Sequence, residues 1–215
     1  MSYLVARAKG VDLRQQGTQQ VGGGNLWRMT SWKLALPIGI FDFAKGALMV
    51  WLAALLGLTI AQQMVVGLAV IIGHNWPIFL RFHGGRGVGT LIGIFTILPL
   101  INDMTIWPTT AFWSILIVGR LVLGSSPLPV LAGIIAAPVL SAVFREPVGV
   151  TLGFIAIALI IVLKRLTAQP PVADNKISTG ELMLNRFLLD RDIRDKKLWM
   201  YRKPSAITRQ GPWED

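Results

Sequence analysis

The chain has 215 residues, of which 53% are apolar and only 15% are charged, yet Lys and Arg outnumber Asp and Glu by 21 to 11. A soluble domain usually has about a quarter of its residues charged, so a mean hydropathy of +0.58 with a net charge of +10 excludes a soluble globular fold. Cysteine is absent and only two histidines are present, which excludes disulfides, a thiolate nucleophile and multi-histidine or cysteine-bound metal sites.

Stretches without Asp, Glu, Lys or Arg locate the expected membrane helices. A bilayer core of about 30 Å needs about 20 helical residues, so the long apolar stretch 46–80 is divided near Gly57. The predicted helices cover residues 34–58, 62–80, 88–101, 109–123, 128–144 and 148–163. The sequence therefore predicts an all-α polytopic integral membrane protein with six transmembrane helices.

The distribution of charge orients these helices. Residues 1–33 carry five basic residues against Asp12 alone, and Arg81, Arg86 and Arg120 lie near helix ends on the same side. The loops on the opposite side hold one aspartate and one Arg-Glu pair. By the positive-inside rule, both termini and the basic loops face the cytoplasm.

From Lys164 the chain becomes a polar tail of 52 residues, 11 of them basic and 7 acidic. We therefore divide the chain into a membrane domain, 1–163, and a basic cytoplasmic tail, 164–215. Within the tail, apolar residues alternate with basic ones between positions 184 and 199. This pattern fits an amphipathic helix at the membrane surface and fits equally well a solvated helix packed on the cytoplasmic loops.

Residues 14–28 form a Gly-rich segment with a basic residue at each end. Consecutive glycines at positions 22 to 24 allow backbone N–H groups to converge on an anion, and Arg28 can add a charge-assisted contact. Phosphate is the expected ligand, and a flexible linker is the alternative.

A second Gly-rich segment, 73–90, runs from the end of one helix into the start of the next. Glycines at a helix start expose N–H donors to an anion, and the Arg86 guanidinium can bind an anion through two N–H groups at once. The structural alternative is a tight interhelical turn. Two such segments on one membrane face suggest a single site for a phosphorylated or otherwise anionic ligand.

Both segments match a known family pattern in order and spacing. The matching residues are Tyr3-Leu4-Val5-Ala6-Arg7, Asp12-Leu13-Arg14, Gly17, Gly22, Asn25 and Arg28, then Asp42-Phe43-Ala44-Lys45-Gly46 and residues 73–90. On these residues the chain resembles the bacterial acyl-phosphate:glycerol-3-phosphate acyltransferases of the PlsY type. The resemblance covers about residues 3–163 and does not extend into the tail. That family has seven spans, so this chain is expected to lack the first of them.

The resemblance implies transfer of a fatty acyl group from acyl phosphate to the 1-hydroxyl of glycerol 3-phosphate, giving lysophosphatidate and phosphate for phospholipid synthesis. Acyl phosphate is already activated, so no metal or other cofactor is expected. The implied partners are acyl phosphate, glycerol 3-phosphate and membrane lipid, with no nucleic acid. The implied location is the bacterial inner cell membrane, with the active face towards the cytoplasm.

The resemblance also implies the residues of the site. The expected catalytic residues are Thr18, Arg28 and Arg86, and the expected substrate-binding residues are Gly22, Asn25, His74, Gly84, Gly85, Gly87, Thr90, Ser125 and Ser126. His74 is expected to form structural hydrogen bonds rather than to act as a base. Asp42 and Lys45, one helical turn apart, are expected to form a structural ion pair.

Two departures from the family pattern keep alternatives open. Arg86 stands where the family has Lys, and residues 164–167 lack the family's His-x-x-Asn. The alternatives are a non-catalytic membrane protein that binds anionic lipid or a phosphorylated metabolite, and an acyltransferase with a different acceptor.

Overall fold

The computed structural model describes residues 1–167 and 177–200, and within these ranges the regular structure is helical. Two short helices come first, followed by six long ones and two in the tail. They are α1 (Ser2–Arg7), α2 (Gly23–Met29), α3 (Trp32–Leu55), α4 (Ile60–Asn75), the 3-10 turn η1 (Ile78–Leu80), α5 (Val88–Ile101), α6 (Trp107–Leu123), α7 (Pro127–Val143), α8 (Val148–Thr167), α9 (Thr179–Leu189) and α10 (Lys196–Met200).

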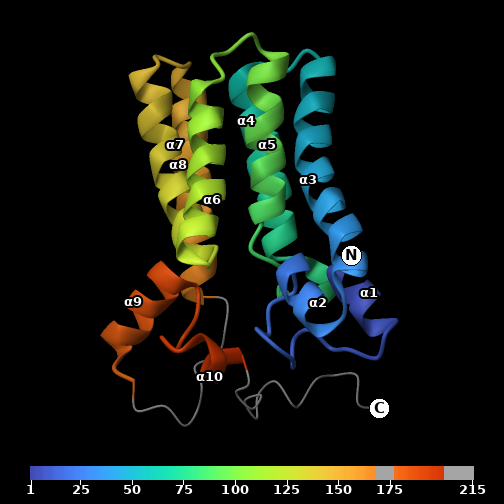
Figure 1. Ribbon diagram of the computed structural model, residues 1–215. Helices are drawn as coiled ribbons and strands as arrows, with labels where there is room; N and C mark the ends of the chain where they lie inside the picture. Colours follow the sequence, from blue (N-terminus) through green and yellow to red (C-terminus); the bar gives the residue numbers. More distant parts are fainter. Residues whose placement is uncertain (168–176, 201–215) are drawn as a thin grey trace.

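The six long helices stand side by side, and α1, α2, α9 and α10 lie together at one end of the bundle (Figure 1). Helices α3, α4 and α5 form one group and α6, α7 and α8 another, with α4 packed against α8 between them. An aromatic stack ties the groups together. The Phe95 ring centroid on α5 lies 4.5 Å from that of Phe112 on α6 and 4.2 Å from that of Phe154 on α8.

The outside of the bundle is apolar, as expected for helices in contact with lipid. Large hydrophobic side chains such as Leu121, Val122 and Leu159 are mostly exposed. Within residues 1–167 and 177–200, three helical segments are suited by length and composition to cross a membrane: Trp32–Leu55, Ile60–Leu80 and Val148–Thr167. The helices α5, α6 and α7 are shorter and apolar; the 14 residues of α5 rise about 21 Å.

All six predicted membrane helices are present, but the predicted end of the second was wrong. It was expected to continue to Leu80, whereas α4 ends at Asn75. Proline disfavours the α conformation in the residue before it, and Trp76, which precedes Pro77, leaves the helical region with φ −132° and ψ 61°. The apolar residues 78–80 instead form the separate turn η1.

The tail segment expected to be one amphipathic helix forms two helices. Helix α9 ends at Leu189, its cap residue Asp190 adopts a left-handed conformation with φ 54°, and α10 begins at Lys196. Helix α9 packs against α7 and α8. Placement of either helix at a membrane surface stays a prediction, as does the division of the chain at residue 163.

Helices α3 and α5 approach each other closely through glycine. A Cβ atom at Gly93 would collide with the carbonyl oxygen of Phe43, and one at Gly46 would collide with the carbonyl oxygen of Thr90. Small residues permit this backbone approach in membrane helices. The α3–α5 contact also fixes the walls of the cavity described below, because the loop before α5 and the start of α3 both line that cavity.

We expect Gly93→Ala to lower the melting temperature of the detergent-purified protein, because the new methyl group meets rigid backbone and overpacking costs about 1–3 kcal/mol. Gly73→Ala is the matched control, since Gly73 is also helical and a Cβ there meets nothing within 4 Å. This control should leave the melting temperature unchanged or raise it slightly. Equal melting temperatures for the two variants would contradict the packing argument.

Candidate functional site

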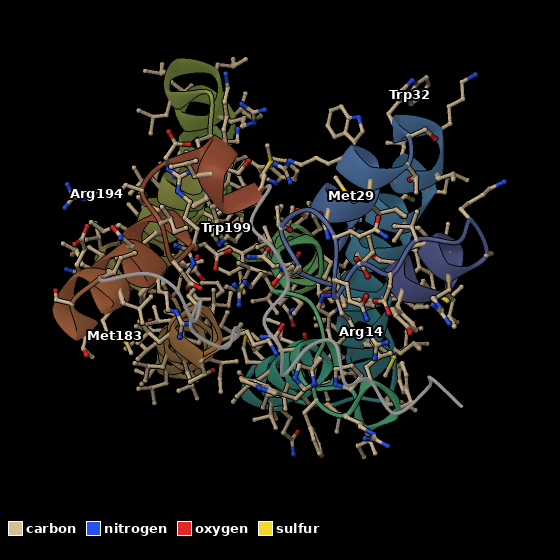
Figure 2. The ribbon with its side chains drawn as sticks, turned by 90° about the horizontal axis from the view of Figure 1, so that it is seen from below. Arg14, Met29, Trp32, Met183, Arg194 and Trp199 are labelled. Atoms are coloured by element: carbon tan, nitrogen blue, oxygen red, sulfur yellow. The ribbon has the colours of Figure 1, made fainter. Side chains whose placement is uncertain are left out.

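A cavity of about 850 Å³ opens at the end of the bundle where the short helices gather. Its walls come from the Gly-rich segment, the start of α3, the loop before α5, the turn between α6 and α7, and the tail. Most of the predicted site residues line it: Thr18, Gly22, Asn25, Arg28, His74, Gly85, Arg86, Gly87, Ser125 and Ser126. Figure 2 looks onto this end, with α1 and α2 on one side and the tail helices on the other.

Two predicted substrate-binding residues do not reach this cavity. Thr90 is completely buried on α5 against Gly46. Gly84 packs under the end of α4, where a Cβ would collide with the carbonyl oxygen of His74. Both positions serve close packing behind the cavity wall.

Asn25 organises the Gly-rich segment from within. Its Oδ1 accepts a hydrogen bond from the Thr18 backbone N–H at 2.9 Å, and its Nδ2 donates to the carbonyl oxygens of Leu13, Gln16 and Gln20 at 3.0 to 3.1 Å. The side chain is 2% exposed, so its amide is committed to the protein. Gly17 turns with φ 62° directly beside this amide. The segment is thus a loop folded around Asn25, which holds Thr18 at the cavity.

The second segment is shaped by the interrupted end of α4. The backbone N–H groups of Gly84 and Gly85 donate to the carbonyl oxygens of Asn75 and His74, each at 3.2 Å. Gly87 then takes φ 72° as the residue before α5. The Lys164 Nζ, from α8, donates to the carbonyl oxygen of Asn75. It also makes a cation–π contact with the Trp76 ring, 4.9 Å from the ring centre. The tight turn and the cavity wall are therefore one and the same structure.

A charged network lies at the floor of the cavity. The Lys45 Nζ donates to Asp42 Oδ1 at 2.6 Å, which confirms the predicted ion pair, and it also contacts Nδ1 of His74. The Asp42 carboxylate lies 3.7 Å from His74 Nδ1. Because an ammonium group can only donate, Nδ1 accepts, and the ring proton belongs on Nε2, next to Gly85. His74 is thus bonded to the ion pair, and its structural role stays a prediction.

Arg86 contacts protein groups through each of its three guanidinium nitrogens. Its Nε donates to Asp190 Oδ2 at 3.1 Å, its Nη2 lies 2.8 Å from Asp190 Oδ1, and its Nη1 donates to the carbonyl oxygen of Lys164 at 2.7 Å. The guanidinium expected to hold a phosphate is here bound to a carboxylate of the tail. Gln20 Nε2 donates to the Asp190 carbonyl oxygen at 3.3 Å, which joins the tail to the Gly-rich segment as well.

Arg28 retains much more freedom. Its Nη1 donates to the carbonyl oxygen of Gly24 at 3.0 Å, and the side chain is exposed at the cavity mouth. Partial burial of its guanidinium at the cavity wall lowers the pKa of Arg28, and the nearby guanidinium of Arg120 lowers this pKa further. Two cations that repel each other across a cavity favour an anion between them.

Sequence reasoning missed the part of the site that the tail supplies. Leu189, Asp190, Arg191, Lys196, Trp199 and Met200 all line the cavity, as does Arg165 at the end of α8. The tail has no local motif for a site, and its basic content alone does not say which residues face inwards.

Comparisons with known proteins agree with the resemblance. A family model described as "Glycerol-3-phosphate acyltransferase" matches residues 1–169. The chain is similar to glycerol-3-phosphate acyltransferase 4 of Dehalococcoides mccartyi (strain CBDB1), with 38% identity over 216 aligned residues that cover 96% of this chain and 89% of the relative. This relative also extends the similarity into the tail, beyond the limit near residue 163 that the motifs indicated.

Two solved structures share the fold. The chain is similar to crystal structures of PlsY (YgiH), an integral membrane glycerol 3-phosphate acyltransferase, in its glycerol 3-phosphate form and its lysophosphatidic acid form. The first has 27% identity and a TM-score of 0.68, covering 76% of this chain and 80% of that one. The second has 26% identity and a TM-score of 0.65, covering 77% and 80%.

We expect Asn25→Ala to loosen the Gly-rich segment, because the buried Thr18 N–H and three carbonyl oxygens lose a partner, at about 1–3 kcal/mol for each unsatisfied group. Hydrogen-exchange mass spectrometry should show deuterium uptake in residues 13–20 about tenfold faster or more.

Asn102→Ala is the control for this variant, because Asn102 is also hydrogen-bonded through its amide but to Gln63 and Leu98. Its uptake should change near residue 102 and stay normal in residues 13–20. Unchanged exchange in the Asn25 variant would show that other contacts hold the loop.

Proposed function

The chain belongs to the glycerol-3-phosphate acyltransferase family, and from this membership we propose that acyl phosphate is its acyl donor. The protein is an integral membrane acyltransferase of phospholipid synthesis that transfers an acyl group to glycerol 3-phosphate. Its membership decides against the non-catalytic alternative and against a different acceptor.

The observation that carries the donor proposal is the two-sided character of the cavity. One side is cationic, with Arg28 and Arg120, and the other is apolar and runs along α3. Trp32, Leu36 and Ile40 line this apolar side and are each more than half exposed on the outer surface of the bundle. An acyl phosphate has a charged head and a long apolar chain, so it fits a cavity that is cationic within and open towards lipid.

The proposed reaction needs no covalent enzyme intermediate. The acceptor hydroxyl oxygen attacks the acyl carbonyl carbon, the bond from that carbon to the phosphate oxygen breaks, and the hydroxyl proton leaves with the phosphate. The protein's task is to hold two anionic substrates close together in a fixed orientation. Arg28 would offset their negative charge, and Thr18, held by Asn25, would lie beside them.

We further propose that the cavity faces the cytoplasm from a bacterial inner membrane. The Lys and Arg residues of the described ranges lie at or towards the cavity end of the bundle, apart from Arg145 in the loop between α7 and α8. Cytoplasmic segments carry an excess of these residues. Glycerol 3-phosphate would then enter from the cytoplasm and the acyl donor from the lipid.

The donor proposal is tested with the purified enzyme in detergent, labelled glycerol 3-phosphate and either acyl phosphate or an acyl thioester. We expect lysophosphatidate and phosphate in equal amounts with acyl phosphate, and no product with the thioester. Product from the thioester alone would contradict the donor assignment and leave the family membership intact.

Arg28→Ala should reduce kcat/KM at least tenfold, because a hydrogen bond to a charged group contributes about 1.5–3 kcal/mol. Arg28 is suited to this test because it is exposed and its side chain donates to the carbonyl oxygen of Gly24, only four residues before it, so the fold should survive. Arg145→Gln, which removes a charge at the opposite end, should leave kcat/KM unchanged. Equal activity of the two variants would remove Arg28 from the site.

A further inference from the structure

We propose that the C-terminal segment 190–200 completes the anion-binding site, with Arg191 and Lys196 binding a substrate phosphate together with Arg28 and Arg120. The inference rests on the proposed function for the identity of the phosphate, which belongs either to glycerol 3-phosphate or to the acyl phosphate. It gives the tail a part in substrate binding.

The segment is held over the cavity by specific contacts. Asp190 is joined to Arg86 and to Gln20, as described above. Two residues further along the chain, Asp192 is 2% exposed and accepts a hydrogen bond from Arg186 Nε at 2.7 Å. The end of α8 is bonded to the same region, since Arg165 Nη1 donates to the Phe187 carbonyl oxygen at 3.0 Å.

Helix α10 turns one of its two lysines towards the cavity. Its start is fixed by Asp195, whose Oδ1 accepts from the backbone N–H groups of Lys197 at 2.7 Å and Leu198 at 2.9 Å. Lys196 and Trp199 are three residues apart, so they share a helix face, and both line the cavity. Leu198 on another face is 66% exposed. In Figure 2, Trp199 lies near the middle of the view and Arg194 at its outer edge.

The cations that meet here have few carboxylates to offset them. Slight burial at the cavity lowers the pKa of Lys196, and the charges of Arg28, Arg120 and Arg191 lower this pKa further. Asp190 and Asp192 are already paired with arginines, which leaves Asp195 as the carboxylate whose charge acts on Arg191 among the described residues.

Arg191 carries a more direct sign of an anionic ligand. Its Nε is buried and has no hydrogen-bond partner within the described ranges, whereas buried N–H groups in proteins are nearly always paired. Burial accordingly lowers the pKa of Arg191. A phosphate oxygen at the cavity would satisfy this donor and the neighbouring ammonium of Lys196 at once.

The test compares Lys196→Ala with Lys197→Ala in the full-length purified enzyme. Both lysines are exposed and adjacent, but only Lys196 lines the cavity. We expect Lys196→Ala to raise KM for one of the two substrates about five- to tenfold, and Lys196→Arg to restore most of the affinity. Measuring KM separately for glycerol 3-phosphate and acyl phosphate identifies which phosphate is bound.

An unchanged KM for both substrates in Lys196→Ala, or an equal rise in Lys197→Ala, would overturn the inference. Calorimetry that measures binding of glycerol 3-phosphate and of inorganic phosphate to the same variants tests the tail site independently of the proposed function. If the wild-type enzyme shows no turnover, the dissociation constants still decide the matter. A dissociation constant that is raised in Lys196→Ala but not in Lys197→Ala supports the tail site, whereas identical constants for the two variants reject it.

Discussion

The ion pair between Arg86 and Asp190 is the interaction on which the rest of the site depends. Arg86 belongs to the loop before α5, and Asp190 belongs to the tail. Arg86 also donates to the carbonyl oxygen of Lys164, which lies in the last turns of α8. The side chains of Arg86 and Asp190 are only 11% and 14% exposed. Removing one partner from such a pair leaves a poorly solvated charge. This contact therefore fixes the tail relative to the membrane bundle, and the cavity exists between them.

The same contact gives a physical reason for an arginine at position 86, where the related motif has lysine. A guanidinium offers five donors in one plane, so it can hold a carboxylate with one edge and a carbonyl oxygen with the other. An ammonium group cannot reproduce this arrangement. A similar explanation applies where the His-x-x-Asn motif is missing. Lys164 there binds the end of α4 and Arg165 binds the Phe187 and Pro127 carbonyl oxygens. These basic residues connect the bundle to the tail.

The sequence predicts the bundle well because each membrane helix contains a long apolar stretch with few or no charges, and its ends are marked by charge, proline or glycine; all of these signals are local. It misplaced the end of α4, since Ile78, Phe79 and Leu80 are as apolar as a helix in lipid and only Pro77 indicates the break. The two Gly-rich segments were also found locally. The role of Asn25 could not be found in this way, because its hydrogen-bond partners are brought together only by the folded loop. The inward face of α10 could not be found either, because it depends on a long-range ion pair at Asp190.

The position of the cavity suits the proposed pair of substrates, of which glycerol 3-phosphate is soluble in water and the acyl donor in lipid. Charged side chains are costly within lipid. Here the exposed cations other than Arg145 lie at or towards the cavity end of the bundle, while the partly buried Asp42, Lys45 and His74 contact one another at the floor. The apolar wall continues onto the exposed side of α3, where Trp32 and Leu36 would contact lipid. The chain of the proposed acyl phosphate could thus remain in an apolar environment while its phosphate reaches the cations. The site must therefore form at the membrane boundary, and the tail covers it from the aqueous side.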